Sequence, residues 1–397
     1  MKILFCLPLM KLSGLEKVAI EYLEGLIQLG YQVDLIIDFD AGKVGNTLEY
    51  AIPKDVNFQY IRTEKIYKFV YYFRVLAKKY KIFKIFLYGF IVLFDFYFYH
   101  AKTKKILQKK QYDFTISFSH FSPSYLTQFK ATKHIIWLHS SVEHFFGGIR
   151  RLFKNSYGKK LNKFDYIITT ANEMRSQLKL FYPELPEEKI KMIYNPFNFN
   201  DIIEKSNIKD DLSKVERLLL NSDYICSVAR LDEEQKDFTT LILAYSKLYF
   251  DKKIEDKLYI IGDGPSKGVL KNLVKSNGLE KQVLFLGEKI NPFVWVKNAK
   301  LFVLSSKFEG FGLILVDAMA VNTFVISSNC KTGPKEILQN GECGDLFEVG
   351  DVDGLSDIIG EALLNDKYRE GKILKASNRI NEFNKANILT KLADILN

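Results

Sequence analysis

Residues 3–37, with the sequence ILFCLPLMKLSGLEKVAIEYLEGLIQLGYQVDLII, decide the fold class of this chain. The short apolar run at residues 3–8 is typical of a buried parallel strand. After a turn at Ser13 and Gly14, apolar side chains recur at helical spacing up to Gly30, which ends the helix. Residues 33–37 are the next apolar run. A strand, a helix and a second strand in this order predict a βαβ unit with a right-handed crossover, and therefore a parallel sheet.

The same alternation recurs along both halves of the chain. In the first half we expect further strands at residues 114–118, 134–138, 166–169 and 191–194. In the second half we expect strands at residues 224–228, 257–261, 283–286, 301–304 and 324–327, and helices at 238–248 and 266–276. The polar residues 198–223 follow Asn195-Pro196 and predict a linker. The fold class is therefore α/β, with two Rossmann-like doubly wound domains, residues 1–197 and 224–380, facing a cleft.

Composition excludes several classes of protein. Hydrophobic residues make up 47% of the 397 residues and charged residues 26%, which indicates a folded chain rather than a disordered one. Nine prolines and four cysteines exclude a collagen-like chain and a disulfide scaffold. The cysteines are scattered, without a CxxC pair, so they are expected to be free thiols and not metal ligands.

The excess of basic residues, 57 − 47 = +10, lies in one block at residues 61–110. This block has 13 basic and 2 acidic residues, together with 15 tyrosines and phenylalanines. We predict that it docks on an anionic membrane surface. In the alternative, the aromatic residues form a helical core and the lysines are solvated. The apolar run at residues 85–101 is shorter than the ~20 residues of a spanning helix, so we expect no membrane span.

The chemistry is concentrated at residues 307–320, KFEGFGLILVDAMA. A strand is followed by a glycine turn and a helix, and the free N–H groups at a helix N-terminus bind phosphate. Glu309 precedes the turn and Asp317 lies eight residues further on, so the two carboxylates could hold hydroxyls on either side of a phosphate. In the alternative, this is a strand–helix connection with solvated acids.

Two basic residues follow the predicted strand at 224–228. Arg230 offers a bidentate fork for a phosphate and Lys236 a point charge. Open α/β sheets bind ligands at the carboxyl ends of their strands, which favours a diphosphate site here. The alternative is a surface salt bridge of either residue with Asp232, Glu233 or Asp237.

Together these motifs resemble the retaining glycosyltransferases of family four, which have the GT-B fold. The resemblance covers nearly the whole chain. Its markers are Ser13-Gly14-Leu15-Glu16-Lys17, Asn195-Pro196, Arg230-Leu231 with Lys236, Gly262-Asp263-Gly264-Pro265, Phe285-Leu286-Gly287, and the glutamate–seven–glutamate motif from Glu309 to position 317. The chain departs from the family at two positions: Ser13 stands where a glycine beside the donor phosphate is usual, and Asp317 where a glutamate is usual.

The resemblance implies roles for residues around the phosphates. Arg230 and Lys236 are expected to hold the nucleotide diphosphate and to neutralise its departing charge. Ser13 and Gly14 lie in the loop expected to approach the phosphates. The N–H groups around Gly312 and Leu313 are expected to do the same.

The resemblance also implies contacts with the sugar and the nucleoside. Glu309 is expected to contact hydroxyls of the donor sugar, with the backbone amides of Gly310 and Phe311 nearby. Asp317 is expected to contact the ribose, and Lys289 lies in the loop expected to border the nucleobase.

His139 ends the predicted strand at 134–138, where similar enzymes keep a histidine that faces the donor sugar. The alternative is that His139 only caps a loop. No catalytic triad and no metal cluster with ligand spacing occurs in the sequence, and the resemblance implies catalysis without a cofactor or a bound metal. It also implies a C-terminal helix, at residues 381–397, that returns to the first domain.

The resemblance implies a retaining transferase that moves a hexose or an N-acetylhexosamine from a UDP-sugar to a glycan acceptor. The acceptor is expected to be lipid-linked, in the synthesis of a bacterial surface polysaccharide such as lipopolysaccharide or capsule. The expected location is the cytoplasm, peripheral to the inner face of the plasma membrane. Residues 328–337, a Gly-Pro turn before a helix, resemble a loop of enzymes that build surface polysaccharides from UDP-sugars, which favours a UDP donor. In the alternative, this turn is a plain strand–helix connector.

Other functions explain less of the sequence. A sugar-nucleotide epimerase shares the architecture but lacks the Glu309 motif in this form. A dinucleotide-dependent oxidoreductase would need a GxGxxG motif after the first strand, where only Gly14 occurs. A non-enzymatic basic module that binds membranes explains only the block at 61–110, and no signature of a nucleic-acid-binding module occurs, so we expect no nucleic acid partner.

Overall fold

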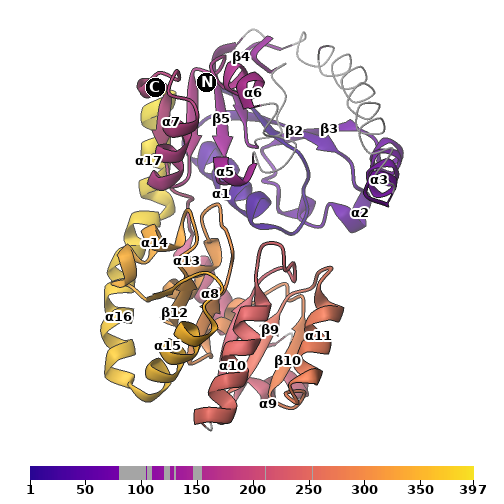
Figure 1. Ribbon diagram of the computed structural model, residues 1–397. Coiled ribbons are helices and arrows are strands. Elements are labelled where there is room, and N and C mark those ends of the chain that lie inside the picture. The colour runs from indigo at the N-terminus through magenta and orange to yellow at the C-terminus, as the bar shows by residue number, and fades with distance from the viewer. Residues whose placement is uncertain are drawn as a thin grey trace. The chain divides into compact units, whose positions relative to one another are not determined.

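The structure is a computed structural model that describes residues 1–79, 104, 110–119, 126–128, 131–145, 154–210, 212–252 and 254–397 (Figure 1). The chain divides into two compact units. Unit 1 comprises Met1–Thr170, Arg175–Pro196 and Lys385–Asn397, and unit 2 comprises Ala171–Met174 and Phe197–Asn384. Each unit contains its own parallel sheet.

Unit 1 is built on a sheet with the strand order β3-β2-β1-β4-β5-β6-β7 in the described part of the chain. The strands are β1 (Lys2–Leu7), β2 (Gln32–Phe39), β3 (Asn57–Arg62), β4 (Tyr112–Ser117), β5 (Ala131–Leu138), β6 (Tyr166–Thr169) and β7 (Ile190–Met192). Every neighbouring pair is parallel, and β1 and β2 are joined by helix α1 (Gly14–Gln28). The predicted βαβ unit is confirmed.

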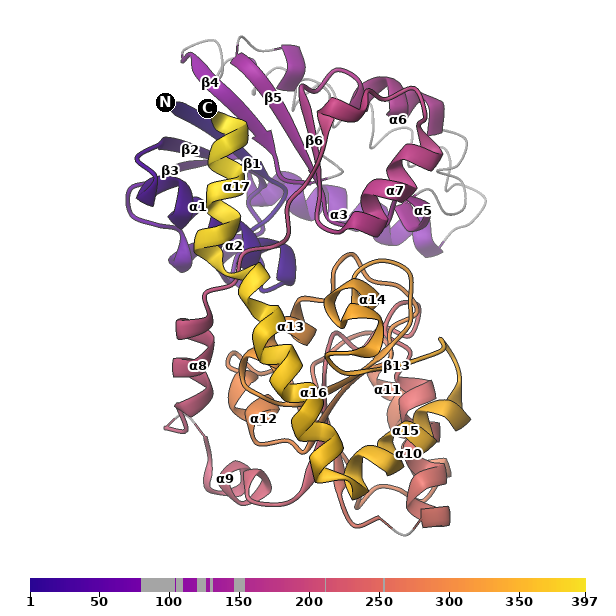
Figure 2. The ribbon, with the colours of Figure 1, turned by 90° about the vertical axis from the view of Figure 1, so that its left-hand side faces the viewer.

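The C-terminal helix α17 (Lys385–Leu396) packs against α1 (Figure 2). A side chain at Gly25 would meet the Leu389 side chain of α17 at 2.3 Å, so the two helices approach closely at this glycine. The Lys385 ammonium lies 2.7 Å from Glu21 and 2.6 Å from Glu24. The last helix thus belongs to unit 1, and it begins at Lys385 rather than at residue 381, which lies in a 3-10 turn.

The other helices of the first half are short, apart from α3 and α7. They are α2 (Gly42–Gly45), α3 (Glu64–Lys79), α5 (Val142–Phe145), α6 (Lys154–Leu161) and α7 (Asn172–Phe181), with 3-10 turns at Glu49–Ala51, Leu126–Gln128 and Glu187–Lys189. The first three residues of α7 fall in unit 2 and the rest in unit 1.

Unit 2 contains a parallel sheet with the strand order β10-β9-β8-β11-β12-β13 among the described residues. The strands are β8 (Tyr224–Val228), β9 (Lys257–Ile261), β10 (Val283–Gly287), β11 (Leu301–Leu304), β12 (Phe324–Ser328) and β13 (Asp345–Phe347). The helices are α8 (Phe199–Asn207), α9 (Lys214–Leu220), α10 (Phe238–Lys252), α11 (Lys267–Ser276), α12 (Phe293–Lys297), α13 (Leu313–Ala320), α14 (Pro334–Ile337), α15 (Val352–Leu364) and α16 (Asp366–Arg379). Leu241, Leu270 and Leu355, from α10, α11 and α15, are fully buried in one core with the strands.

Residues 198–223, predicted as a linker, instead form helices α8 and α9 of unit 2. Asn198 caps α8 by accepting a hydrogen bond from the N–H of Asp201, and Ser213 and Glu216 form a capping box at α9. Helix α8 buries Ile202 and packs against α12. The buried residues of the two helices are only Ile202, Ser206 and Leu220, so the segment lacks the apolar periodicity that predicts a packed helix.

The basic, aromatic block at residues 61–110 is described mainly through α3. This helix buries Val70 and leaves Phe69, Tyr71 and Tyr72 exposed. The run at residues 85–101 lies outside the described residues, so the structure does not test its predicted place at a membrane interface. Among the residues that are described, no helix combines the length and the apolar character needed to cross a bilayer.

Candidate active site

The glycine turn after β11 leads directly into α13, as predicted. Gly312 caps the helix with φ 97° and ψ 49°, a left-handed conformation that favours glycine. The first N–H groups of a helix lack partners within it, so those of Leu313 and Ile314 can bind an anion, whereas the N–H of Leu315 donates to the Gly312 carbonyl. A side chain at Gly333 would lie 1.9 Å from the carbonyl oxygen of Phe311, so the loop after β12 packs directly on the backbone of this turn.

Lys236 and Glu309 meet at this turn although 73 residues separate them. The Lys236 ammonium donates to Oε1 of Glu309 over 2.5 Å, and the side chains are only 15% and 8% exposed. The strands that precede them, β8 and β11, are neighbours in the sheet. The alternative prediction for Lys236 was an ion pair with Asp232, Glu233 or Asp237, and its ion pair is with Glu309 instead.

Arg230 lies at the surface, with its side chain 60% exposed and Nη2 2.8 Å from Oδ2 of Asp232. For Arg230 the alternative prediction, a surface ion pair with Asp232, is therefore confirmed. An exposed pair of this kind contributes little to stability, so the guanidinium can turn to another anion at small cost. Its role at a phosphate remains a prediction.

The loop that carries Arg230 and Lys236 is held at both ends. The N–H of Leu231 donates to the carbonyl of Asp263 over 3.0 Å, and Gly264 has no room for a side chain next to Leu231. The carboxylate of Glu233 accepts the N–H of Phe238 over 2.7 Å and so caps α10. The Gly262–Pro265 motif therefore fixes the loop that presents the two basic residues.

Two further predicted residues of unit 2, Asp317 and Lys289, lie on other segments than Lys236 and Glu309. Asp317 is half-buried on α13. Lys289 donates to Oε1 of Glu216 on α9 over 2.6 Å. This bond, together with the bonds from Ser213, lowers the pKa of Glu216 to about 2. Ile290, next to Lys289, is 82% exposed, so this loop presents an apolar surface near α9.

Ser13, Gly14 and His139 belong to unit 1. Ser13 is the N-cap of α1, Gly14 is its first residue, and the Ser13 hydroxyl donates to the carboxylate of Glu16. Burial raises the pKa of Glu16, and the bond from Ser13 opposes this shift. His139 follows β5, half-buried, with its ring centroid 4.3 Å from that of Phe118.

Buried hydroxyl groups that were not predicted from the sequence surround the Lys236–Glu309 pair. Ser306 donates to Oε1 of Glu309 over 2.6 Å, and Ser305 donates to the carbonyl of Lys236 over 3.1 Å. Ser328 donates to the carbonyl of Ser306 over 2.5 Å, and Thr332 to the carbonyl of Glu309. Their signal in the sequence is the serines directly after two predicted strands, Ser305 and Ser306 after the first and Ser328 after the second.

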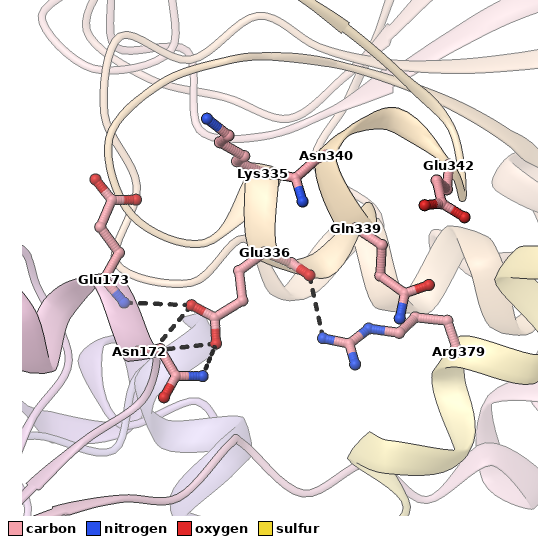
Figure 3. Close-up of a pocket in the computed structure, with 8 residues that line it drawn as sticks. All are labelled: Asn172, Glu173, Lys335, Glu336, Gln339, Asn340, Glu342 and Arg379. Carbon is pink, nitrogen blue, oxygen red and sulfur yellow. Dashed lines mark hydrogen bonds between the residues drawn. The ribbon is translucent and has the colours of Figure 1, made fainter.

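A cavity of about 720 Å³ lies in unit 2 (Figure 3). It is lined by Asn172, Glu173, Lys335, Glu336, Gln339, Asn340, Glu342 and Arg379. Glu336 accepts the N–H of Asn172 over 2.8 Å, and Arg379 donates to the Glu336 carbonyl over 3.1 Å. These polar groups already hold the start of α7 and α14, and no predicted site residue lines the cavity. The candidate active site is therefore at Lys236 and Glu309.

Family models match both halves of the chain. Residues 208–379 match the model described as glycosyl transferases group 1, and residues 12–201 match the model of glycosyltransferase family 4. The chain belongs to the group 1 glycosyltransferases. The family predicted from the motifs is thereby confirmed.

Curated relatives of this glycosyltransferase include enzymes named for sugar transfer to glycans. One is the N-acetylgalactosamine-N,N'-diacetylbacillosaminyl-diphospho-undecaprenol 4-alpha-N-acetylgalactosaminyltransferase of Campylobacter jejuni, 30% identical over 59% of this chain and 63% of that protein. Another is the lipopolysaccharide 1,6-galactosyltransferase of Salmonella typhimurium, 23% identical over 58% of each chain. The chain thus spans less than two thirds of the length of these relatives.

Solved structures share the fold. HepE of Anabaena in complex with UDP superposes with a TM-score of 0.74 at 20% identity, covering 100% of this chain and 99% of that one. The glycosyltransferase WaaG, involved in lipopolysaccharide biosynthesis, gives 0.71 at 13% identity, covering 99% of each chain. At sequence identities this low, the structural similarity establishes the fold alone. The predicted GT-B class with two Rossmann-like domains is confirmed.

Proposed function

We propose that this protein is a retaining transferase that moves a hexose or an N-acetylhexosamine from a UDP-sugar to a glycan acceptor, in the synthesis of a bacterial surface polysaccharide. The observation that carries the proposal is the meeting of Lys236 and Glu309 beside the glycine turn at the start of α13. A cation, a carboxylate and free helix N–H groups in one place fit a sugar diphosphate.

The chemistry of the proposed reaction follows from these groups. Breaking the bond between the sugar and the diphosphate leaves negative charge on the leaving group. Lys236, Arg230 and the N–H groups around Leu313 offset that charge, a task that a divalent cation performs in other transferases. Glu309 accepts hydrogen bonds from hydroxyls of the sugar. We therefore propose a reaction without a bound metal, whose rate is unchanged by a chelator.

The UDP donor is supported by the comparisons. Curated relatives are named for N-acetylgalactosaminyl and galactosyl transfer, and one structure with the same fold holds UDP. Asp317 on α13 is proposed to contact the ribose, and the loop with Lys289 and Ile290 to border the base.

The proposed acceptor is a lipid-linked glycan, reached by docking at the inner face of the plasma membrane. A relative from Campylobacter jejuni is named for a diphospho-undecaprenol acceptor. In the described part of the basic block, α3 exposes Phe69, Tyr71 and Tyr72 on the same helix as Lys65 and Lys68. Aromatic and basic side chains together suit the headgroup region of an anionic membrane.

A donor panel tests the proposed function. Purified protein is incubated with UDP-glucose, UDP-galactose, their N-acetyl forms and GDP-mannose, and release of the nucleotide is followed with and without lipid-linked glycan. We expect UDP release from one UDP-sugar and an α-linked product from the α-linked donor. Conversion of the donor to an epimer without sugar transfer, or equal use of GDP-mannose, would contradict the proposal.

A further inference from the structure

Ser306 holds the carboxylate of Glu309 from the protein side. The hydroxyl is fully buried, and its Oγ donates to Oε1 of Glu309 over 2.6 Å. This length is that of a strong hydrogen bond from a hydroxyl to a carboxylate. Lys236 donates to the same oxygen over 2.5 Å. Both contacts that the described residues make with this carboxylate use Oε1, so Oε2 is left for a ligand.

The backbone around Ser306 and Glu309 is itself fixed. Ser328 donates to the carbonyl of Ser306, and Thr332 donates to the carbonyl of Glu309. The N–H of Lys307 donates to the carbonyl of Gln235 over 2.7 Å, which ties this turn to the loop of Lys236. With the backbone fixed, the remaining freedom of Glu309 is the orientation of its side chain. Ser306 and Lys236 together select that orientation.

Binding of the sugar donor changes how Ser306 and Lys236 share the task of orienting Glu309. Under the proposed function, the Lys236 ammonium binds the diphosphate, and it then no longer directs its charge at Glu309 alone. Ser306 is a neutral hydrogen-bond donor and is fully buried, so we expect it not to contact the sugar donor. Its bond to Oε1 therefore persists while Lys236 moves, and Oε2 keeps its direction.

We propose that Ser306 is a positioning residue of the transfer reaction, which holds Glu309 in the orientation that contacts the donor sugar once Lys236 turns to the diphosphate. This inference rests on the proposed function. A purely structural serine would satisfy a buried polar group and affect stability alone. A positioning serine affects turnover through Glu309 and through no other residue.

The test is a double-mutant cycle on transfer kinetics. Ser306→Ala is expected to lower kcat about tenfold or more, with UDP affinity within about twofold of wild type. In a Glu309→Ala background, the same substitution is expected to cause no further loss, because the carboxylate it positions is gone. Ser306→Thr, which retains the hydroxyl, is expected to restore most of kcat.

Thr323→Val is the matched control. Thr323 is also buried in unit 2 and donates its hydroxyl to a backbone carbonyl, that of Val296, over 2.8 Å. It lies at the amino end of β12, opposite the candidate site. Thermal unfolding and UDP binding show whether each variant is folded, which keeps the test decisive if the extra methyl of Ser306→Thr does not fit.

The outcomes separate the inference from the proposed function. If Glu309→Ala retains wild-type turnover, the site assigned under the proposed function is wrong. If Glu309→Ala lowers turnover strongly but Ser306→Ala behaves like Thr323→Val, the proposed function stands and the positioning role of Ser306 is overturned. If the factors by which Ser306→Ala and Glu309→Ala lower kcat multiply in the double mutant, the positioning role of Ser306 is also overturned.

Discussion

Replacing Lys236 by methionine removes the ammonium from a buried ion pair and leaves the Glu309 carboxylate with the Ser306 hydroxyl as its remaining described donor. Removing one partner of a buried pair costs about 3–5 kcal/mol, because a charge stays buried without compensation. Glu309 is 8% exposed and keeps one hydrogen bond, so we expect about 3 kcal/mol, at the lower end of that range.

Arg230→Met is the matched comparison. Arg230 also pairs with a carboxylate, but its side chain is 60% exposed, and such pairs contribute about 0–1 kcal/mol. For a domain of this size, each kcal/mol lowers the Tm by about 2–4 °C. Thermal unfolding should therefore show a Tm about 6–12 °C lower for Lys236→Met and at most about 4 °C lower for Arg230→Met.

The double variant Lys236→Met with Glu309→Gln tests the physical cause. Removing both charges eliminates the uncompensated carboxylate, and replacing a buried pair as a whole is often neutral for stability. We expect the Tm to recover to within about 4 °C of wild type. Equal losses for Lys236→Met and Arg230→Met, or no recovery in the double variant, would refute the reasoning. Lys236→Met and Arg230→Met should each lose UDP affinity if Lys236 and Arg230 hold the diphosphate.

Three further predictions concern the carboxylates and the basic block. Glu309→Gln should lower kcat by about a hundredfold with little change in UDP affinity, whereas Asp317→Ala should mainly raise the KM for the sugar donor. Steady-state kinetics of both variants test this. The reverse pattern would mean that Asp317, and not Glu309, contacts the transferred sugar. The pKa of Glu216 lies below its ordinary value because of Lys289, so its pair adds stability above about pH 4.5 that is lost as the pH falls toward 2. Between pH 4.5 and 2, the free energy of unfolding of Glu216→Gln should therefore fall by about 1 kcal/mol less than that of the wild type. The same fall in both proteins would contradict the pairing of Glu216 with Lys289. Sedimentation with anionic vesicles should pellet the protein at low salt, and neutral vesicles should not. Replacing Lys78, Lys79, Lys81 and Lys84 by serine should weaken vesicle binding and leave hydrolysis of the sugar donor intact. Binding indifferent to lipid charge would instead favour an aromatic core in the block.

The sequence predicted the central strands well, because each is a short apolar run buried on both faces. It missed β3 and β13. Three of the six residues of β3 are exposed, and β13 has only three residues, so neither presents an apolar run. Both lie at the edges of their sheets, where a strand needs fewer buried side chains.

The candidate site was predicted in parts rather than as a whole. The glycine turn follows from local chemistry, since Gly312 needs a left-handed conformation. The partner of Lys236 could not be found by local reading, because Glu309 approaches it through the pairing of β8 and β11. The role of Ser306 depends on the direction of a single hydroxyl, which sequence spacing does not reveal.

A crystal structure of the protein with UDP is the measurement that tests the central claim most directly. The account predicts the diphosphate at the start of α13, with the Lys236 ammonium within hydrogen-bond distance of a phosphate oxygen and Ser306 still bound to Glu309. UDP bound elsewhere in unit 2, with the Lys236–Glu309 pair unchanged, would contradict it.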